Sequence, residues 1–383
     1  MRTLLTAARY LGPAGIVSQP WFLLEGATLV AAGSRGSAQA PAADRRLAFP
    51  DSTLAPAFFD VHLHGAAGHD VMEATPEALG AISRFLAGHG VGSFLATTVT
   101  ASIDDTLRAL SRLAQLQRQQ QPGAQPLGIH LEGPFLSHAK RGVHRPELLQ
   151  PAERTLFDRF WQAAEGTIRL LTLAPELPGA VELAAHATAL GVRVSLGHSN
   201  ADAETTQRAI RAGASSATHT FNAMRALDHR EPGILGTVLS DQALFAELIC
   251  DGVHVHPDLV RLWWRAKGPQ RSILITDAMR ATGMPDGTYT LAGQTVQVAH
   301  GRATADGVLA GSVLTLDRAL TNFLRFTGAT LDQAIPLLTT NPATMTGLHT
   351  AAPQPGSPAD FTVLAPDGTL QATLLRGALV EPS

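Results

Sequence analysis

The sequence predicts an α/β protein: a (β/α)8 TIM-like barrel joined to a small β-sandwich module that the N- and C-terminal segments form together. Two observations carry this prediction. From about residue 54, short apolar strands alternate with longer amphipathic helices until eight strands have been counted. On either side of that alternation, short β-like runs are separated by turn-forming residues and show no helical period. The length of 383 residues agrees, because such a barrel needs about 250 residues.

The domain boundaries follow from the positions at which the sequence pattern changes between β-like runs and alternating strands and helices. We expect residues 1–51 and 350–383 to form the β-sandwich module and residues 52–349 to form the barrel. A Gly-punctuated, β-rich stretch near residues 288–309 is predicted to be an insertion between the eighth strand and its helix.

The eight strand candidates are short apolar runs. Helix-capping signals such as Thr75-Pro76 open several of the segments between them. In chain order the strands are expected at residues 56–62, 93–99, 127–131, 167–173, 193–196, 217–220, 245–249 and 272–276.

Composition excludes several classes of protein. The net charge is −3 and no basic stripe is present, so no nucleic-acid partner is expected. No run approaches the ~18 apolar residues of a membrane span, and Arg9 interrupts the N-terminal apolar stretch before a signal peptide could form. We therefore expect a cytoplasmic protein without a membrane partner. Its single cysteine, Cys250, allows neither an internal disulfide nor a cysteine-based zinc cluster.

Residue types that bind metals stand at the ends of five predicted strands. The C-terminal ends of barrel strands meet at one mouth, so side chains placed there converge. They are His62 and His64 after the first strand, Glu132 after the third, His198 after the fifth, His219 after the sixth and Asp277 after the eighth. Imidazoles and carboxylates gathered around one point favour a divalent metal such as zinc.

Each of these residues also has an ordinary structural explanation. An H-x-H pair alone is a weak signal, although its two-residue spacing puts both rings on one face of a strand. His198 and His219 could be core histidines, Glu132 could form a salt bridge, and Asp277 could cap a helix. Independent structural roles would not place all of these residues at one barrel mouth, so we favour the metal site.

Longer motifs around these residues carry a family resemblance. From about residue 50 to the C-terminus the chain resembles the N-acetylglucosamine-6-phosphate deacetylase family of the amidohydrolase superfamily. The motifs are FFDVHLHG at 58–65, GIHLEGPF at 128–135, LGHS at 196–199, THTFNAM at 218–224, REPG at 230–233, DGVH at 251–254 and TDA at 276–278.

The resemblance implies a reaction and roles for individual residues. Acetyl groups would be removed from N-acetyl-D-glucosamine 6-phosphate by attack of a metal-bound hydroxide. Glu132, His198 and His219 would hold the principal metal ion. Asp277 would act as general base and then as general acid, and His144 would point at the acetyl carbonyl and stabilise the oxyanion.

The resemblance also implies which residues bind the phosphate end of the substrate. Asn222, the backbone N–H of Ala223, Arg230 and His254 would bind the phosphorylated amino sugar. Part of this pocket comes from the neighbouring subunit in relatives, which implies a homodimer. Arg225 stands where relatives often have proline or a small residue, so it could strengthen anion binding or alter substrate choice.

Several alternatives stay open at this level. A second ion could be held by His62 and His64 with Glu132 and Asp277, because ligand types do not fix occupancy. The substrate could be the galacto epimer, N-acetylgalactosamine 6-phosphate, or another amide cleaved by a metal-dependent amidohydrolase. A catalytically dead barrel that serves as a scaffold should have lost at least one ligand, and here none is missing.

Overall fold

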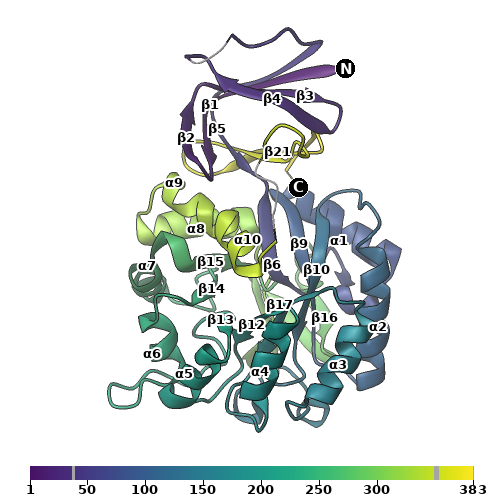
Figure 1. Ribbon diagram of the computed structural model, residues 1–383, viewed down its shortest axis with the longest axis vertical. Helices are drawn as coiled ribbons and strands as arrows, with labels where there is room; N and C mark the ends of the chain where they lie inside the picture. Colours follow the sequence, from purple (N-terminus) through teal and green to yellow (C-terminus); the bar gives the residue numbers. More distant parts are fainter. Residues whose placement is uncertain (37–38, 349–352, 383) are drawn as a thin grey trace.

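A computed structural model describes residues 1–36, 39–348 and 353–382 of the chain. Its largest element is a ring of eight parallel strands, each paired with the next, which confirms the expected barrel (Figure 1). A parallel bridge between Leu63 and Ala278 joins the first strand to the segment after the last one. The strands are β6 Phe58–Leu63, β9 Val91–Thr98, β10 Gln125–Glu132, β11 Ile168–Leu173, β12 Arg193–Leu196, β13 Ala214–Ala217, β14 Phe245–Ile249 and β15 Ser272–Ile275.

Helices cover the outside of the barrel, and most of the longer ones bury an apolar face while their other face is exposed. Side-chain caps begin several of them; for example, Thr75 accepts a hydrogen bond from the N–H of Ala78 at 3.2 Å. None of the described helices is long and apolar enough to cross a membrane. The helices are α1 Pro76–Gly88, α2 Ile103–Leu116, α3 Arg154–Ala163, α4 Ala180–Ala189, α5 Ala203–Arg211, α6 Gly233–Ser240, α7 Pro257–Arg271, α8 Leu316–Thr327, α9 Leu331–Ala334 and α10 Thr340–Thr346.

The N- and C-terminal segments pair into one mixed sheet that lies beyond the barrel (Figure 1). Strand β5 connects them, since it is parallel to β1 and antiparallel to β20. Phe22 and Phe361 pack in the core of this sheet with ring centroids 4.8 Å apart. The strands are β1 Arg2–Gly12, β2 Gly15–Ser18, β3 Pro20–Glu25, β4 Thr28–Ser34, β5 Arg45–Pro56, β20 Phe361–Leu364, β21 Leu370–Leu375 and β22 Ala378–Val380. Strand β5 thus runs beyond residue 51, and the expected boundary at residues 349–350 lies outside the described residues.

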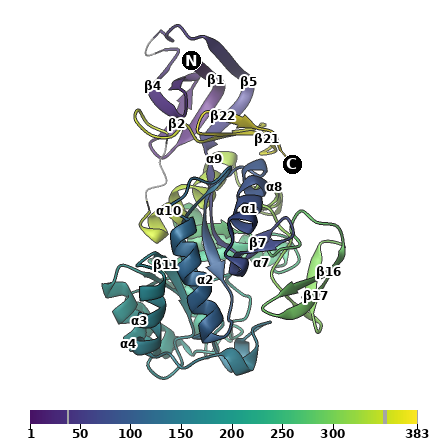
Figure 2. The ribbon, with the colours of Figure 1, turned by 90° about the vertical axis from the view of Figure 1, so that its right-hand side faces the viewer.

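The insertion after the eighth strand forms its own antiparallel sheet, which stands beside the barrel (Figure 2). Its strands are β16 Gly287–Leu291, β17 Gln294–Ala299, β18 Arg302–Ala305 and β19 Val308–Leu309. Leu291 and Val296 pack with Met279 in a small core of their own. This packing attaches the insertion to the segment that follows Asp277, so the sheet lies next to the barrel mouth.

Shorter elements lie in the loops. Strands β7 Gly65–Ala66 and β8 His69–Asp70 pair with each other. Four 3-10 helices complete the description: η1 Val71–Glu73, η2 His138–Lys140, η3 Pro146–Leu148 and η4 Ile335–Leu338. The sixth barrel strand differs from the expected one, because it ends at Ala217 rather than at residue 220. The backbone leaves the extended conformation there, and His219 has a φ of 30°.

Candidate metal centre and substrate pocket

The strand-end residues singled out in the sequence do converge at the C-terminal mouth of the barrel. His62 lies in β6, Glu132 is the last residue of β10, and the others follow their strands within two residues. All six side chains are buried, and the most exposed of them, Asp277, has an exposed fraction of 8%. The six residues are His62, His64, Glu132, His198, His219 and Asp277.

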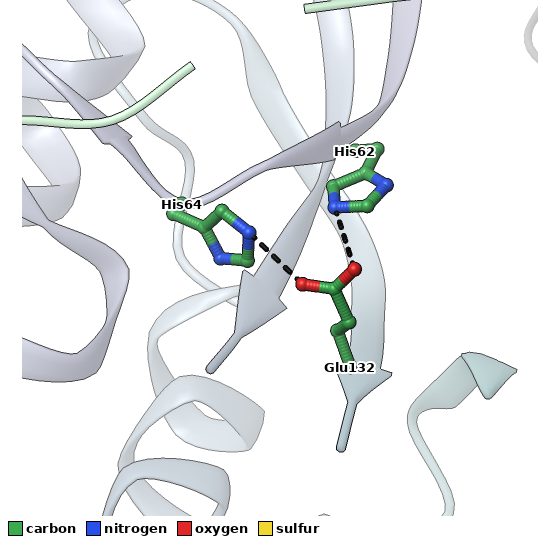
Figure 3. Close-up of side chains that lie close together, drawn as sticks. All are labelled: His62, His64 and Glu132. Atoms are coloured by element: carbon green, nitrogen blue, oxygen red, sulfur yellow. Dashed lines mark ion pairs between the residues drawn. The ribbon is translucent and has the colours of Figure 1, made fainter. Parts of the chain in front are cut away.

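Glu132 lies at the centre of the cluster, with histidines facing both of its carboxylate oxygens (Figure 3). His64 Nε2 lies 3.1 Å from Oε2. The Nε2 atoms of the other three histidines face Oε1, at 3.4 Å for His62, 3.5 Å for His198 and 3.2 Å for His219. Glu132 therefore belongs to two groups of three possible ligands, one with His62 and His64 and one with His198 and His219.

The histidine rings are oriented as metal ligands require. In three of them Nδ1 faces an oxygen that can only accept a hydrogen bond, so in the neutral ring the proton lies on Nδ1 and the Nε2 lone pair faces the cluster. The acceptors are Thr97 O at 3.3 Å from His64, Lys140 O at 2.9 Å from His198 and Glu247 Oε2 at 3.3 Å from His62. Within the described residues the buried Nε2 of His62 has no hydrogen-bond partner. Such a donor set fits a divalent metal ion.

Charge in the cluster also suits a cation. Burial alone raises the pKa of Glu132, but His62 and the other histidines hold the pKa well below its usual range. Burial likewise raises the pKa of Asp277, but the hydrogen bond with His64 and the nearby histidines lower it overall. Both carboxylates are therefore anionic at neutral pH. Burial alone lowers the pKa of His64, while Asp277 and Glu132 raise it to about 9, so this ring also binds a proton on Nε2, which a divalent cation would displace.

Asp277 lies beside the two histidines of the first strand. Its Oδ1 is 3.3 Å from His64 Nε2 and 3.7 Å from His62 Nε2. The backbone of Asp277 is left-handed, with a φ of 51°, and two hydrogen bonds hold it there. Its N–H donates to His62 O at 2.9 Å, and its carbonyl accepts from Ser312 N–H at 2.7 Å. Non-glycine residues in this conformation are strained, and such strain is found most often at functional sites.

His144 reaches the same cluster from the loop after β10. Its Nε2 lies 3.8 Å from Glu132 Oε2, and its Nδ1 lies 2.8 Å from the hydroxyl of Thr100. Burial lowers the pKa of His144 to about 3, and the nearby His198 acts in the same direction. The imidazole is therefore neutral at physiological pH.

A cavity of about 480 Å³ opens beside the cluster. Asn222, Ala223 and His254 line it together with His219 and Asp277, so three of the four predicted sugar-phosphate ligands lie in the same cavity as two members of the cluster. Asp251 holds the ring of His254 through a 2.6 Å contact with Nδ1. Further lining comes from residues 139–142 and from β19 of the insertion.

Two arginines lie elsewhere. Arg230, the fourth predicted phosphate ligand, is exposed on the loop after Asp228 and does not line this cavity. Arg225 is half-buried, and its Cγ and Cδ pack beside Gly233. Hydrogen bonds from Thr205 are the main cause of the lowered pKa of Asp202, and the charge of Arg225 lowers that pKa further. Neither guanidinium is brought into the cavity by its own chain.

The sequence analysis missed three residues that support the cluster. Glu247 contacts His62, Thr100 contacts His144, and Asp60 accepts hydrogen bonds from Thr276 Oγ1 at 2.6 Å and from His62 N–H at 3.2 Å. A signal was available for Glu247, because a charged residue inside an apolar strand is rarely buried without a partner. No comparable signal singles out Thr100.

Comparisons with known proteins agree with this geometry. The family model for the amidohydrolase family matches residues 53–380. N-acetylgalactosamine-6-phosphate deacetylase of Escherichia coli O157:H7 is 42% identical over 332 residues, which cover 86% of this chain and 88% of the relative. N-acetylglucosamine-6-phosphate deacetylase of Bacillus subtilis (strain 168) is 38% identical over 334 residues, which cover 85% and 84%. In a solved structure, a mutant N-acetyl-D-glucosamine-6-phosphate deacetylase from Mycobacterium smegmatis is in complex with N-acetyl-D-glucosamine-6-phosphate. It matches with a TM-score of 0.93 and 36% identity over 99% of both chains.

Proposed function

Because the chain belongs to the amidohydrolase family, we propose that it removes the acetyl group from N-acetyl-D-glucosamine 6-phosphate to give D-glucosamine 6-phosphate and acetate. The observation that carries the proposal is the position of Asp277. Its carboxylate faces both the histidine cluster and the cavity lined by Asn222, Ala223 and His254. An amide bond held in that cavity would lie next to a buried anionic base.

Two metal positions fit the ligand groups. Glu132, His198 and His219 would hold the principal ion, and His62, His64 and Glu132 would hold a second one. We propose zinc, because imidazole and carboxylate ligands without cysteine suit it. A divalent cation held there would supply polarisation of the amide carbonyl and would lower the pKa of a water molecule to about 7.

The protein's own groups would move the protons. Asp277 would take a proton from the attacking water and then pass it to the nitrogen of the departing amino sugar, which leaves poorly unless it is protonated. His144 would donate a hydrogen bond to the acetyl oxygen. The Thr100 hydroxyl can donate to His144 Nδ1, and in that tautomer the proton of the neutral ring lies on Nε2, which faces the cluster.

The phosphate would bind at the other end of the cavity. Asn222, the Ala223 N–H and His254 would contact it from this chain. Arg230 would come from a second copy of the chain, which agrees with its exposed position outside the cavity. Leu227 on the same loop has an exposed fraction of 52%, as a residue buried in a homodimer contact could have. The cytoplasmic location stays a prediction.

The galacto epimer is the second candidate substrate, because the relative that is 42% identical carries that name. The test is acetate release by the metal-loaded protein from the two phosphorylated epimers and from unphosphorylated N-acetylglucosamine. We expect the highest kcat/KM for the gluco phosphate and a much lower value for the unphosphorylated sugar. A higher kcat/KM for the galacto phosphate would make that epimer the substrate. Turnover of neither phosphate would refute the proposed function.

A further inference from the structure

Glu247 is a carboxylate enclosed in the barrel, and the proposed reaction gives it no role. It lies in the middle of β14, between apolar neighbours, and its exposed fraction is 0%. An unpaired charge in such a place is destabilising, so a fully buried glutamate is almost always paired. Its contacts therefore indicate what it does.

The Glu247 carboxylate faces two members of the histidine cluster. Its Oε2 lies 3.3 Å from His62 Nδ1 and also accepts a longer hydrogen bond, of 3.4 Å, from the backbone N–H of His219. The first contact is to an imidazole ring, and the second is to a main-chain group that stays in place whichever way the His219 ring turns. Glu247 thus controls the His62 ring more directly than it controls the His219 ring.

His130 provides an internal contrast with His62. Its ring is also fully buried, and the two ring centroids are 4.6 Å apart. Both nitrogens of His130 face threonine hydroxyls, at 3.3 Å for Thr97 and 2.8 Å for Thr172. A hydroxyl can donate or accept, so neither contact fixes the tautomer. The carboxylate of Glu247 can only accept, and it therefore holds the proton of His62 on Nδ1.

We propose that Glu247 is a positioning residue, which fixes the tautomer and the orientation of His62 so that Nε2 can hold a divalent cation together with His64 and Glu132. The inference rests on the metal site of the proposed function. His62 Nε2 is 3.4 Å from Glu132 Oε1 and, among the described residues, has no hydrogen-bond partner. Carboxylates that accept from the second nitrogen of a ligand histidine raise its basicity and typically change metal affinity by about 10–100-fold.

The test is Glu247→Gln, with Zn²⁺ binding to metal-free protein measured by calorimetry and chelator competition. Because Glu247 Oε2 also accepts from the backbone N–H of His219, the amide oxygen should occupy the same position. This neutral acceptor holds the Nδ1–H of His62 less strongly than a carboxylate does and lowers the basicity of Nε2. For the wild type we expect two bound ions per chain. In the variant, we expect one of them to bind about 10–100-fold more weakly, while the ion at Glu132, His198 and His219 is retained.

Two further variants separate ring positioning from other effects. Asp60→Asn removes another fully buried carboxylate, which contacts the backbone N–H of His62 and the hydroxyl of Thr276 but not the His62 ring, so both ions should still bind tightly. In a His62→Ala background, Glu247→Gln should not weaken zinc binding further. If Glu247→Gln fails to fold, Glu247→Asp should keep the fold but draw the carboxylate back from His62, and weaken the same ion.

Three results would overturn the inference. They are tight binding of two ions by Glu247→Gln, an equal loss of affinity in Asp60→Asn, and a wild type that binds only one ion. An effect of Glu247→Gln that persists in the His62→Ala background would assign the role to His219 instead. The readout needs no turnover, so failure of the proposed deacetylation would leave the zinc result interpretable.

Discussion

Replacing Asp277 with asparagine should remove nearly all turnover while leaving the fold and the metal content intact. The two side chains have the same shape, so the packing around residue 277 is preserved. Asparagine also tolerates the left-handed backbone that Asp277 adopts at a φ of 51° better than other residues do. An alanine there would combine loss of the carboxylate with added backbone strain, so asparagine isolates the chemistry.

The size of the loss follows from the proposed role of the carboxylate. A general acid or base contributes about 10²–10⁴-fold to rate, and Asp277 would act in both proton transfers. We therefore expect kcat to fall by at least about 10³-fold, which is about 4 kcal/mol of transition-state stabilisation. Zinc should remain, because Glu132, His198 and His219 form a complete ligand group without Asp277.

The assay combines acetate release, zinc content and circular dichroism on one preparation. Asp306→Asn is the matched control. It makes the same chemical change at an exposed turn residue whose backbone has a similar φ of 48°. The control should keep wild-type kcat. If Asp277→Asn loses its zinc as well as its activity, Asp277 is primarily a ligand, and a variant that keeps more than a tenth of the activity would refute its role as the base.

Three further predictions concern the carbonyl, the phosphate and stability. His144→Asn should lower kcat by about 10²–10³-fold with zinc retained, as loss of an oxyanion donor does; unchanged kcat would exclude that role. Arg230→Ala should raise KM about 10–100-fold for the phosphorylated sugar only, and equal effects on the unphosphorylated sugar would contradict phosphate binding. Burial alone raises the pKa of Asp317, but its hydrogen bond with His89 lowers the pKa overall. The ionised carboxylate therefore stabilises the fold at pH values above its unfolded-state pKa of about 4. This contribution is lost as the pH falls through the lower pKa of the folded state. Asp317→Asn should thus lower the melting temperature at pH 7 and have a smaller effect as the pH falls below about 4, whereas an effect of the same size at every pH would refute the linkage.

The barrel and the strand-end residues that converge at its mouth could be predicted because the signals are local. Each of these residues stands at or just after the end of a short apolar run, as Glu132 does at the end of β10, and the barrel geometry then brings the strand ends together. The sixth strand was placed too late for a related reason. Residues 214–220 are uniformly small or polar, so no hydrophobic period marks where β13 ends and the turn at His219 begins.

Contacts between distant segments could not be predicted from the sequence. Glu247 and His62 are 185 positions apart, and only the closed barrel makes them neighbours. Thr100 is one of many threonines until the fold brings it to His144. The position of Arg230 depends on how copies of the chain assemble, and a single chain holds no contact that decides it.

The most direct test of the whole account is acetate release from N-acetylglucosamine 6-phosphate by one preparation, measured metal-free and again after zinc is restored, with ions counted per chain. We predict no release by the metal-free protein and full release once one or two ions are bound. Release at the full rate without metal, or none from the zinc-loaded protein, would contradict the account.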